Sequence, residues 1–196
     1  MGNPIDQAAL DTLFNEGRTF DAFLDREVPD GLLQQAYDLA KMTPTSANCQ
    51  PMRVLFLRSA EAKERLAPAL SSTNRDKTVI APVVAIVAHD LEFYENLPKL
   101  YRVPGAEKWF MGQDGLIEET AFRNGALQGA CLMLALRAVG LDVGPMSGFK
   151  NDMVDEEFFS GTGWRSNFIC NVGYGDPSGL PPRDPRLDFD EACRIE

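Results

Sequence analysis

The sequence predicts one α+β domain in which helices cover both faces of a central sheet. Residues 79–90 and 166–175 are almost wholly apolar and rich in β-branched side chains, which is typical of strands buried on both faces. Residues 116–139 have the composition of one long helix, and strands and helices alternate irregularly along the chain. The 196 residues, 44% of them hydrophobic, suffice for a single sizeable core without internal repeats.

Periodicity and capping signals predict the elements of the first half. Apolar residues recur at helical spacing in 6–14. The amphipathic stretch 30–42 must end before Pro44, because a residue before proline disfavours the helical conformation. Ser59 is suited to cap a short helix. The expected elements are therefore helices at 6–14, 30–42 and 59–70 and strands at 53–59 and 79–90.

The second half begins with an irregular segment. Residues 91–113 mix aromatic, charged and proline residues without a sustained period, and they are a candidate lid over a binding site. The helix 116–139 would be roughly 36 Å long at 1.5 Å per residue. Its circumference is almost entirely apolar or small after Asn124, so we expect it to be buried with help from a second subunit. A small-residue turn at 144–149, the strand 166–175 and a proline-rich tail complete the domain.

Charge and metal-ligand content exclude several classes of function. The net charge of −10, without a Lys/Arg block, argues against nucleic-acid binding. Four dispersed cysteines and one histidine, His89, do not support a metal site, and His89 is expected at the surface at a strand end. No signal peptide or bilayer-length apolar run is present, so we expect a cytoplasmic protein with free thiols and no membrane association.

Small hydrogen-bonding and cationic residues gather in separated clusters. The stretch TPTSANCQP at 43–51 has more polar groups than a turn requires. Judged singly, each cluster has an ordinary explanation: a solvated charge, a helix stop, an exposed turn or a charged tail. The sequence contains no dinucleotide-binding glycine fingerprint, phosphate loop or nucleophile elbow. The clusters are Arg18-Thr19, residues 45–50, residues 74–77, the turn 144–149, and Arg183 with Arg186.

Together and in this order, the clusters resemble the flavin-binding pattern of the nitroreductase family. That resemblance implies a three-layer sandwich with a mostly antiparallel central sheet and a long central helix at a homodimer interface. It implies FMN, bound between two subunits, and NADPH or NADH as electron donor. The implied cofactor-binding residues are Arg18, Thr19, Thr45, Ser46, Asn48, Gln50, Asn74, Lys77, Pro145, Met146, Ser147, Gly148, Arg183 and Arg186.

The chemistry of these residues is suited to FMN. Arginine forks provide charge and paired donors for a phosphate dianion, and either Arg183 or Arg186 could join Arg18 there. Amide and hydroxyl side chains can form hydrogen bonds with both the donor and the acceptors at the isoalloxazine edge. Lys77 would stabilise negative charge on the reduced ring. No residue is assigned as the acid–base catalyst, although Ser147 is a candidate near the ring.

Particular stretches are similar to malonic semialdehyde reductases of the pyrimidine-utilisation (Rut) pathway within this family. These are TPTSANC, LAPALSS, EETAFRN, GLDVGPMSGF and NVGYGD. The resemblance implies ping-pong hydride transfer that converts malonic semialdehyde to 3-hydroxypropionate, with Arg102 and Arg123 as candidates for the substrate carboxylate. Three alternatives stay open: a broad-specificity nitro, quinone or enal reductase, a non-catalytic flavin-binding protein, and a cofactor-free association module.

Overall fold

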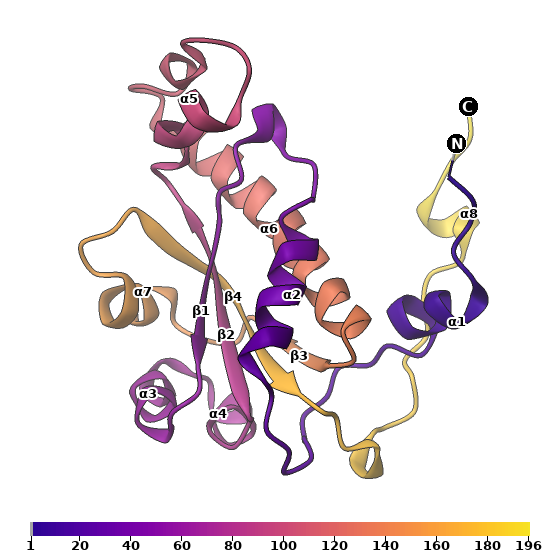
Figure 1. Ribbon diagram of the computed structural model, residues 1–196. Helices are drawn as coiled ribbons and strands as arrows, with labels where there is room; N and C mark the ends of the chain where they lie inside the picture. The colour runs from indigo at the N-terminus through magenta and orange to yellow at the C-terminus, as the bar shows by residue number, and fades with distance from the viewer. Residues whose placement is uncertain (1) are drawn as a thin grey trace.

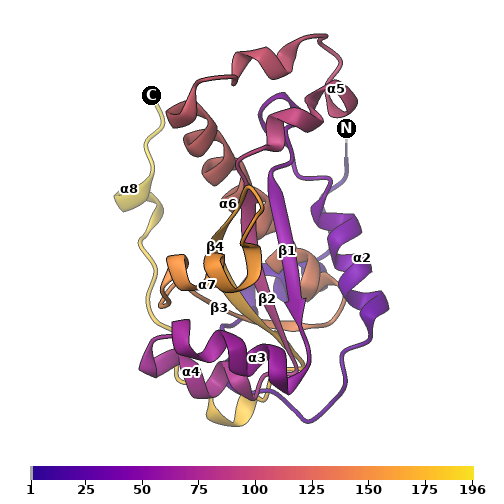
Figure 2. The ribbon, with the colours of Figure 1, turned by 90° about the vertical axis from the view of Figure 1, so that its left-hand side faces the viewer.

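The computed structural model describes residues 2–196 and has a four-stranded antiparallel sheet of order β1-β2-β4-β3 with helices on both faces (Figures 1 and 2). This confirms the predicted α+β sandwich. The strands are β1 (Met52–Leu57), β2 (Val83–Asp90), β3 (Asp142–Met146) and β4 (Trp164–Gly173). The helices are α1 (Gln7–Leu10), α2 (Asp30–Ala40), α3 (Ala60–Leu66), α4 (Ser72–Val79), α5 (Leu97–Leu100), α6 (Asp114–Ala138), α7 (Asn151–Phe159) and α8 (Phe189–Ala192).

The central strand β2 is buried along its whole length because helices lie against both of its faces. Successive side chains of a strand point to opposite faces of the sheet. Accordingly Val83, Ala85 and Val87 pack with α2 and α6. The alternate residues, Val84, Ile86 and Ala88, pack with residues of α3 and α7. The two faces thus contribute two hydrophobic cores.

Three local expectations were wrong. The strand predicted at 79–90 begins only at Val83, because residues 72–79 form α4 instead. Residues 144–146 of the predicted turn at 144–149 belong instead to strand β3. This strand pairs with β4 from Asp142↔Gly173 to Met146↔Ile169. No element was predicted for residues 151–159, which form helix α7. All three misses involve short, weakly periodic segments, whose conformation depends on neighbours distant in sequence.

Helix α6 approaches the sheet closely at two glycines one turn apart. A Cβ atom added at Gly125 would lie 2.8 Å from the Cβ of His89, and one at Gly129 would lie 2.6 Å from the Phe168 ring. Both distances are shorter than van der Waals contact, so only glycine fits without movement. These positions bring α6 against β2 and β4.

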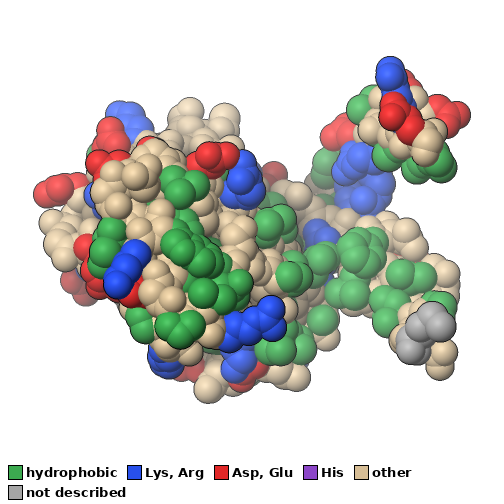
Figure 3. All heavy atoms as spheres, turned by 90° about the horizontal axis from the view of Figure 1, so that it is seen from above, with side chains coloured by type: hydrophobic (Ala, Val, Ile, Leu, Met, Phe, Trp, Pro, Cys, Tyr) green, Lys and Arg blue, Asp and Glu red, His purple; other side chains and the backbone are tan. Residues whose placement is uncertain are grey.

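The outward face of α6 and the chain ends are less covered. Phe122 and Leu127 are 54% and 50% exposed, so α6 is only partly buried within one chain. Apolar side chains are visible across the face seen from above in Figure 3. The segments carrying α1 and α8 extend away from the body of the domain on the same side in Figure 1. Within residues 2–196, no helix is both long and apolar enough to cross a membrane.

We expect Gly125→Ala to lower the free energy of unfolding by about 1–3 kcal/mol, because the new methyl group meets a Cβ that cannot rotate away. Gly115→Ala on the same helix is the matched control, since nothing lies within 4 Å of its added Cβ. The control should be neutral or stabilising by up to about 1 kcal/mol. Chemical denaturation measures both, and equal stability of the two variants would contradict the close contact.

Candidate functional site

Several predicted cationic residues lie together in one cavity. Arg18 and Thr19, in the segment after α1, and Arg183 and Arg186, in the C-terminal tail, line a cavity of about 460 Å³. Arg137, from the last turn of α6, lines the same cavity. A chain with net charge −10 therefore gathers four arginines around one hollow, which is the local basic environment that an anionic ligand requires.

Backbone carbonyl groups hold these arginines in place. Arg183 Nη2 donates to the carbonyl oxygens of Asn15 (2.7 Å) and Gly17 (3.0 Å), so the tail is tied to the segment that carries Arg18. Arg18 donates to the Pro181 carbonyl in return. Arg186 instead donates only to carbonyls of its own neighbours in residues 184–185. Each guanidinium has five N–H donors, so donors remain for an anion.

Helix α4 brings a second group of predicted residues against the end of β3. Asn74 Nδ2 donates to the Gly148 carbonyl at 3.1 Å. A Cβ at Gly148 would lie only 2.6 Å from that nitrogen, so a side chain there would push α4 away. Pro145, Met146 and Ser147 line an adjacent shallow cavity of about 270 Å³, together with Met133 and Phe168.

An ion pair joins the two groups. Lys77 Nζ lies 2.8 Å from Asp21 Oδ1, and Asp21 lines the arginine cavity. The buried Asn171 supports this arrangement from β4 by donating to the Lys77 carbonyl at 3.2 Å. Together, the two groups of residues are called the basic site. Its members are Arg18, Thr19, Asn74, Lys77, Pro145, Met146, Ser147, Gly148, Arg183 and Arg186.

The predicted loop residues lie elsewhere. Thr45, Ser46, Asn48 and Gln50 precede β1, whose first residue, Met52, pairs with His89 near the end of β2. Lys77 lies before the start of β2, and a strand of eight residues spans about 25 Å. In one chain the loop and the basic site are therefore at opposite ends of the sheet, as Figure 1 shows for the segments next to α5 and α4.

The loop is packed against the irregular 91–113 segment. Asn48 Nδ2 donates to the Leu100 carbonyl at 2.8 Å, and Gln50 Nε2 donates to Asn48 Oδ1 at 3.0 Å. Phe93 and Phe110 pack against each other and, with the buried Cys49, form part of a small separate core. Burial raises the pKa of Cys49 to about 11, so this thiol is protonated at neutral pH and acts as a packing residue.

The two candidate substrate residues have different surroundings. Arg102 is exposed in the 91–113 segment. Arg123 forms an ion pair with Glu119, four residues earlier on α6. This is the usual geometry of a helix surface pair and gives Arg123 a structural partner.

His89 is buried, which corrects the expectation of a surface histidine. Its side chain is only 5% exposed because Gly125 and Phe122 of α6 cover it. It lines a second cavity of about 610 Å³ together with residues that include Phe122, Asp155 and Arg165. Within residues 2–196 its Nδ1 atom has no hydrogen-bond partner. Desolvation lowers the pKa of His89, although Asp155 and Glu118 oppose that shift.

Sequence reasoning missed three side chains around these sites. Arg137 lies beneath the Arg18 segment and donates to the Leu13 and Arg18 carbonyls. Asn124 and Gln128, on α6, accept hydrogen bonds from the backbone at both ends of the predicted loop. The only available signal was two carboxamides four residues apart in a stretch that is otherwise apolar or small.

A model of the nitroreductase family matches residues 18–174. A protein of Stenotrophomonas maltophilia with the provisional name NADH dehydrogenase/NAD(P)H nitroreductase is 57% identical over 195 residues, covering all of both chains. A protein of Ralstonia pickettii with the same provisional name is 54% identical over 190 residues, covering 95% of this chain and 97% of its own.

Solved structures share the fold at lower sequence identity. The crystal structure of a provisionally named nitroreductase of Bacillus subtilis has a TM-score of 0.85 at 20% identity, covering 97% of this chain and all of that one. A crystal structure from Exiguobacterium sibiricum, described as a complex of a nitroreductase with FMN, has a TM-score of 0.83 at 20% identity. It covers 100% of this chain and 99% of that one.

We expect Asp21→Asn to bind inorganic phosphate about fivefold more tightly, because the change removes a negative charge from the arginine cavity and frees Lys77. Isothermal titration at low ionic strength measures the affinity. Asp25→Asn makes the same charge change outside the lining of this cavity and should have a smaller effect. Equal affinities for the two variants would contradict an anion site here.

The free energy of unfolding should fall as the pH drops from 7 to about 5.5. The unfolded chain has an ordinary histidine pKa of about 6.5, whereas the folded pKa is lower. Below pH 6.5 the unfolded state therefore binds more protons, so folding loses stability until the pH passes the folded pKa. His89 is the only histidine, so His89→Gln should flatten this slope in denaturation measured across the window. If the pH dependence of the unfolding free energy were the same in His89→Gln as in the wild type, titration of carboxylates and not of His89 would be its cause.

Proposed function

This chain belongs to the nitroreductase family, and from that premise we propose that it is an FMN-dependent NAD(P)H oxidoreductase that reduces malonic semialdehyde to 3-hydroxypropionate. The observation that carries the cofactor assignment is the basic site, in which cations and small residues from distant segments meet. The family relationship makes it an NAD(P)H oxidoreductase, and the subgroup stretches quoted above support the aldehyde as acceptor. We place the reaction in the cytoplasm.

The donor set of the basic site is suited to FMN. Arg18 and Arg183 lie on segments tied to each other by hydrogen bonds, which suits a phosphate that must accept from several directions. Asn74 and Gly148 lie in contact where α4 meets the end of β3, and the absence of a side chain at Gly148 lets the Asn74 amide approach this backbone closely. The chemistry that FMN supplies is hydride transfer from NAD(P)H to the carbonyl carbon of the aldehyde.

The residues of the chain are proposed to bind the cofactor, orient the substrate and shield the site from water. Arg183, rather than Arg186, is proposed as the second phosphate ligand, because it is anchored next to Arg18. Lys77, paired with Asp21 at the arginine cavity, is proposed to provide positive charge to the bound cofactor. Ser147, which lines the shallow cavity, is a candidate for orienting the substrate. Segment 91–113 is proposed as a lid, with Arg102 rather than the paired Arg123 available to the substrate carboxylate.

A homodimer completes the proposed site. The loop at 45–50 and the basic site are at opposite ends of one chain, so two antiparallel copies could place the loop of one against the basic site of the other. The exposed apolar residues of α6 and the extending segments with α1 and α8 provide surface for that association. Burial of this apolar surface would favour association of the two copies. Because each flavin is proposed to contact both subunits, dilution to monomers should release it.

Replacing Arg183 by alanine should weaken FMN binding at least about tenfold, because a charge-assisted phosphate contact is lost. Arg186→Ala is the matched control in the same tail and should change the dissociation constant less than about threefold. Quenching of flavin fluorescence during titration measures both constants. The reverse ranking would exchange the roles of the two arginines.

Anaerobic stopped-flow spectroscopy tests the acceptor. NADPH or NADH should bleach the bound flavin, and malonic semialdehyde should restore its absorbance much faster than nitrofurazone does, because the site is proposed to hold a carboxylate. Faster reoxidation by nitrofurazone, quinones or enals would support the broad-specificity alternative instead. Flavin uptake without bleaching would indicate a binding protein, and a protein that takes up no FMN would overturn the assignment.

A further inference from the structure

The loop before β1 has a strained backbone. Ala47, Asn48 and Gln50 have φ angles of 51°, 51° and 42°, in the left-handed region that residues other than glycine rarely adopt. Each such residue costs roughly 1–2 kcal/mol, so surrounding contacts must stabilise the conformation. The side chains that the family resemblance assigns to the flavin edge, Asn48 and Gln50, belong to this strained stretch.

Two buried carboxamides of α6 hold the ends of the loop. Asn124 Oδ1 accepts from the Ser46 N–H at 2.9 Å, and Gln128 Oε1 accepts from the Met52 N–H at 3.0 Å. Both side chains are 2% exposed. Asn124 also donates to the Thr120 carbonyl at 2.8 Å, which fixes the orientation of its amide. The two residues are one helical turn apart, so a single face of α6 fixes where the loop begins and ends.

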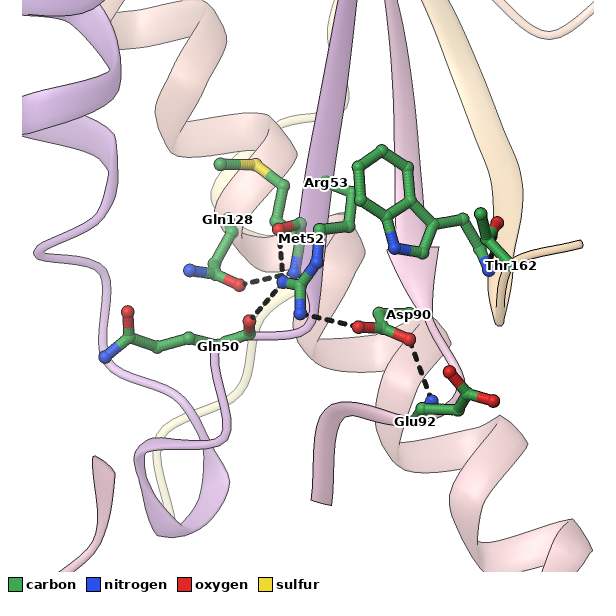
Figure 4. A network of polar contacts seen from close by, with 8 residues as sticks. Gln50, Met52, Arg53, Asp90, Glu92, Gln128 and Thr162 are labelled. Carbon is green, nitrogen blue, oxygen red and sulfur yellow. Dashed lines mark hydrogen bonds and ion pairs between the residues drawn. The ribbon is translucent and has the colours of Figure 1, made fainter. Parts of the chain in front are cut away.

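Arg53 holds the C-terminal part of the loop. Its Nη1 donates to the carbonyls of Gln50 (3.1 Å) and Met52 (3.0 Å), while its Nη2 lies 2.6 Å from Asp90 Oδ2. Asp90 in turn accepts from the Glu92 N–H at 2.9 Å. Figure 4 shows Gln128 and Arg53 reaching the chain around Met52 from opposite sides. The loop is therefore restrained at Ser46, Gln50 and Met52.

The burial of these carboxamides is difficult to explain by packing alone. Burying an amide costs free energy unless it is hydrogen-bonded, and an apolar side chain would fit this stretch of α6 better. Gly125, between the two, allows the helix to approach the sheet closely enough for their short side chains to reach the loop. The burial of Asn124 and Gln128, their spacing of one helical turn and the close approach of α6 to the sheet are thus all explained by the hydrogen bonds to the loop backbone.

We propose that Asn124 and Gln128 are positioning residues that hold residues 45–52 in the strained conformation required for flavin binding. They act through the loop and do not themselves touch the cofactor. The part of this inference that concerns flavin rests on the function proposed above. The part that concerns the loop depends only on the contacts within one chain.

Gln128→Met and Asn124→Leu are the variants for the test, because each keeps the approximate volume of the side chain and removes the acceptor. Hydrogen exchange followed by mass spectrometry on the protein without added FMN should show exchange of the 45–52 amides accelerated at least about tenfold, with β2 unchanged. The FMN dissociation constant should rise about tenfold. Gln128→Glu keeps an oxygen acceptor and should restore much of the protection of the loop.

Thr120→Val is the matched control, buried one turn earlier on the same helix without a side-chain hydrogen bond to the loop among the described residues. It should leave loop exchange and FMN affinity unchanged even if it lowers the melting temperature. Unchanged loop exchange in Gln128→Met, or an equal change in Thr120→Val, would overturn the proposal. If Asn124→Leu does not fold, Gln128→Met decides alone.

The two proposals fail separately in this experiment. Wild-type protein that binds no FMN would refute the proposed function, while the hydrogen-exchange comparison would still decide whether the two residues hold the loop. Conversely, normal FMN binding by both variants, with an unprotected loop, would keep the proposed function and reject the positioning role.

Discussion

The close packing of α6 on the central sheet is the contact on which the rest of the structure depends. Gly125 and Gly129 let the helix backbone lie directly on residues of β2 and β4, at a distance that any side chain would increase. Because protein interiors are nearly close-packed, a shift of the helix would be transmitted to everything that it contacts. Its last turn supports the Arg18 segment through Arg137, and its middle supports the loop before β1 through Asn124 and Gln128.

A second constraint is electrostatic. The chain carries an excess of acidic residues, yet four arginines line one cavity, and carbonyl groups rather than carboxylates hold Arg18, Arg183 and Arg186. A carbonyl satisfies a guanidinium hydrogen bond without neutralising its charge, so the cavity remains positive. Two carboxylates, Asp21 and Asp184, also line this cavity, and the pairing of Asp21 with Lys77 limits how much positive charge an incoming anion meets.

Much of the fold could be predicted because its signals are local. The apolar run at 83–90 is a buried strand, the periodic stretch at 30–40 is a helix, and the long helix was expected within two residues of its observed ends. The segments that were not predicted, β3, α4 and α7, are short and weakly patterned. Their conformation comes from partners far away in sequence, such as the pairing of β3 with β4 and the contact of Asn74 with Gly148.

The sequence by itself determined which residue types were available: the arginines, the polar loop and the small residues after the long helix, each recognisable from composition and spacing. Only the tertiary structure decided their grouping. It brought Arg18, Lys77 and Arg183 together, kept Asn48 and Gln50 at the far end of the sheet, and buried His89 beneath a glycine of α6. The physical reason is that spacing along a chain specifies local conformation, whereas proximity between distant segments depends on how whole elements pack.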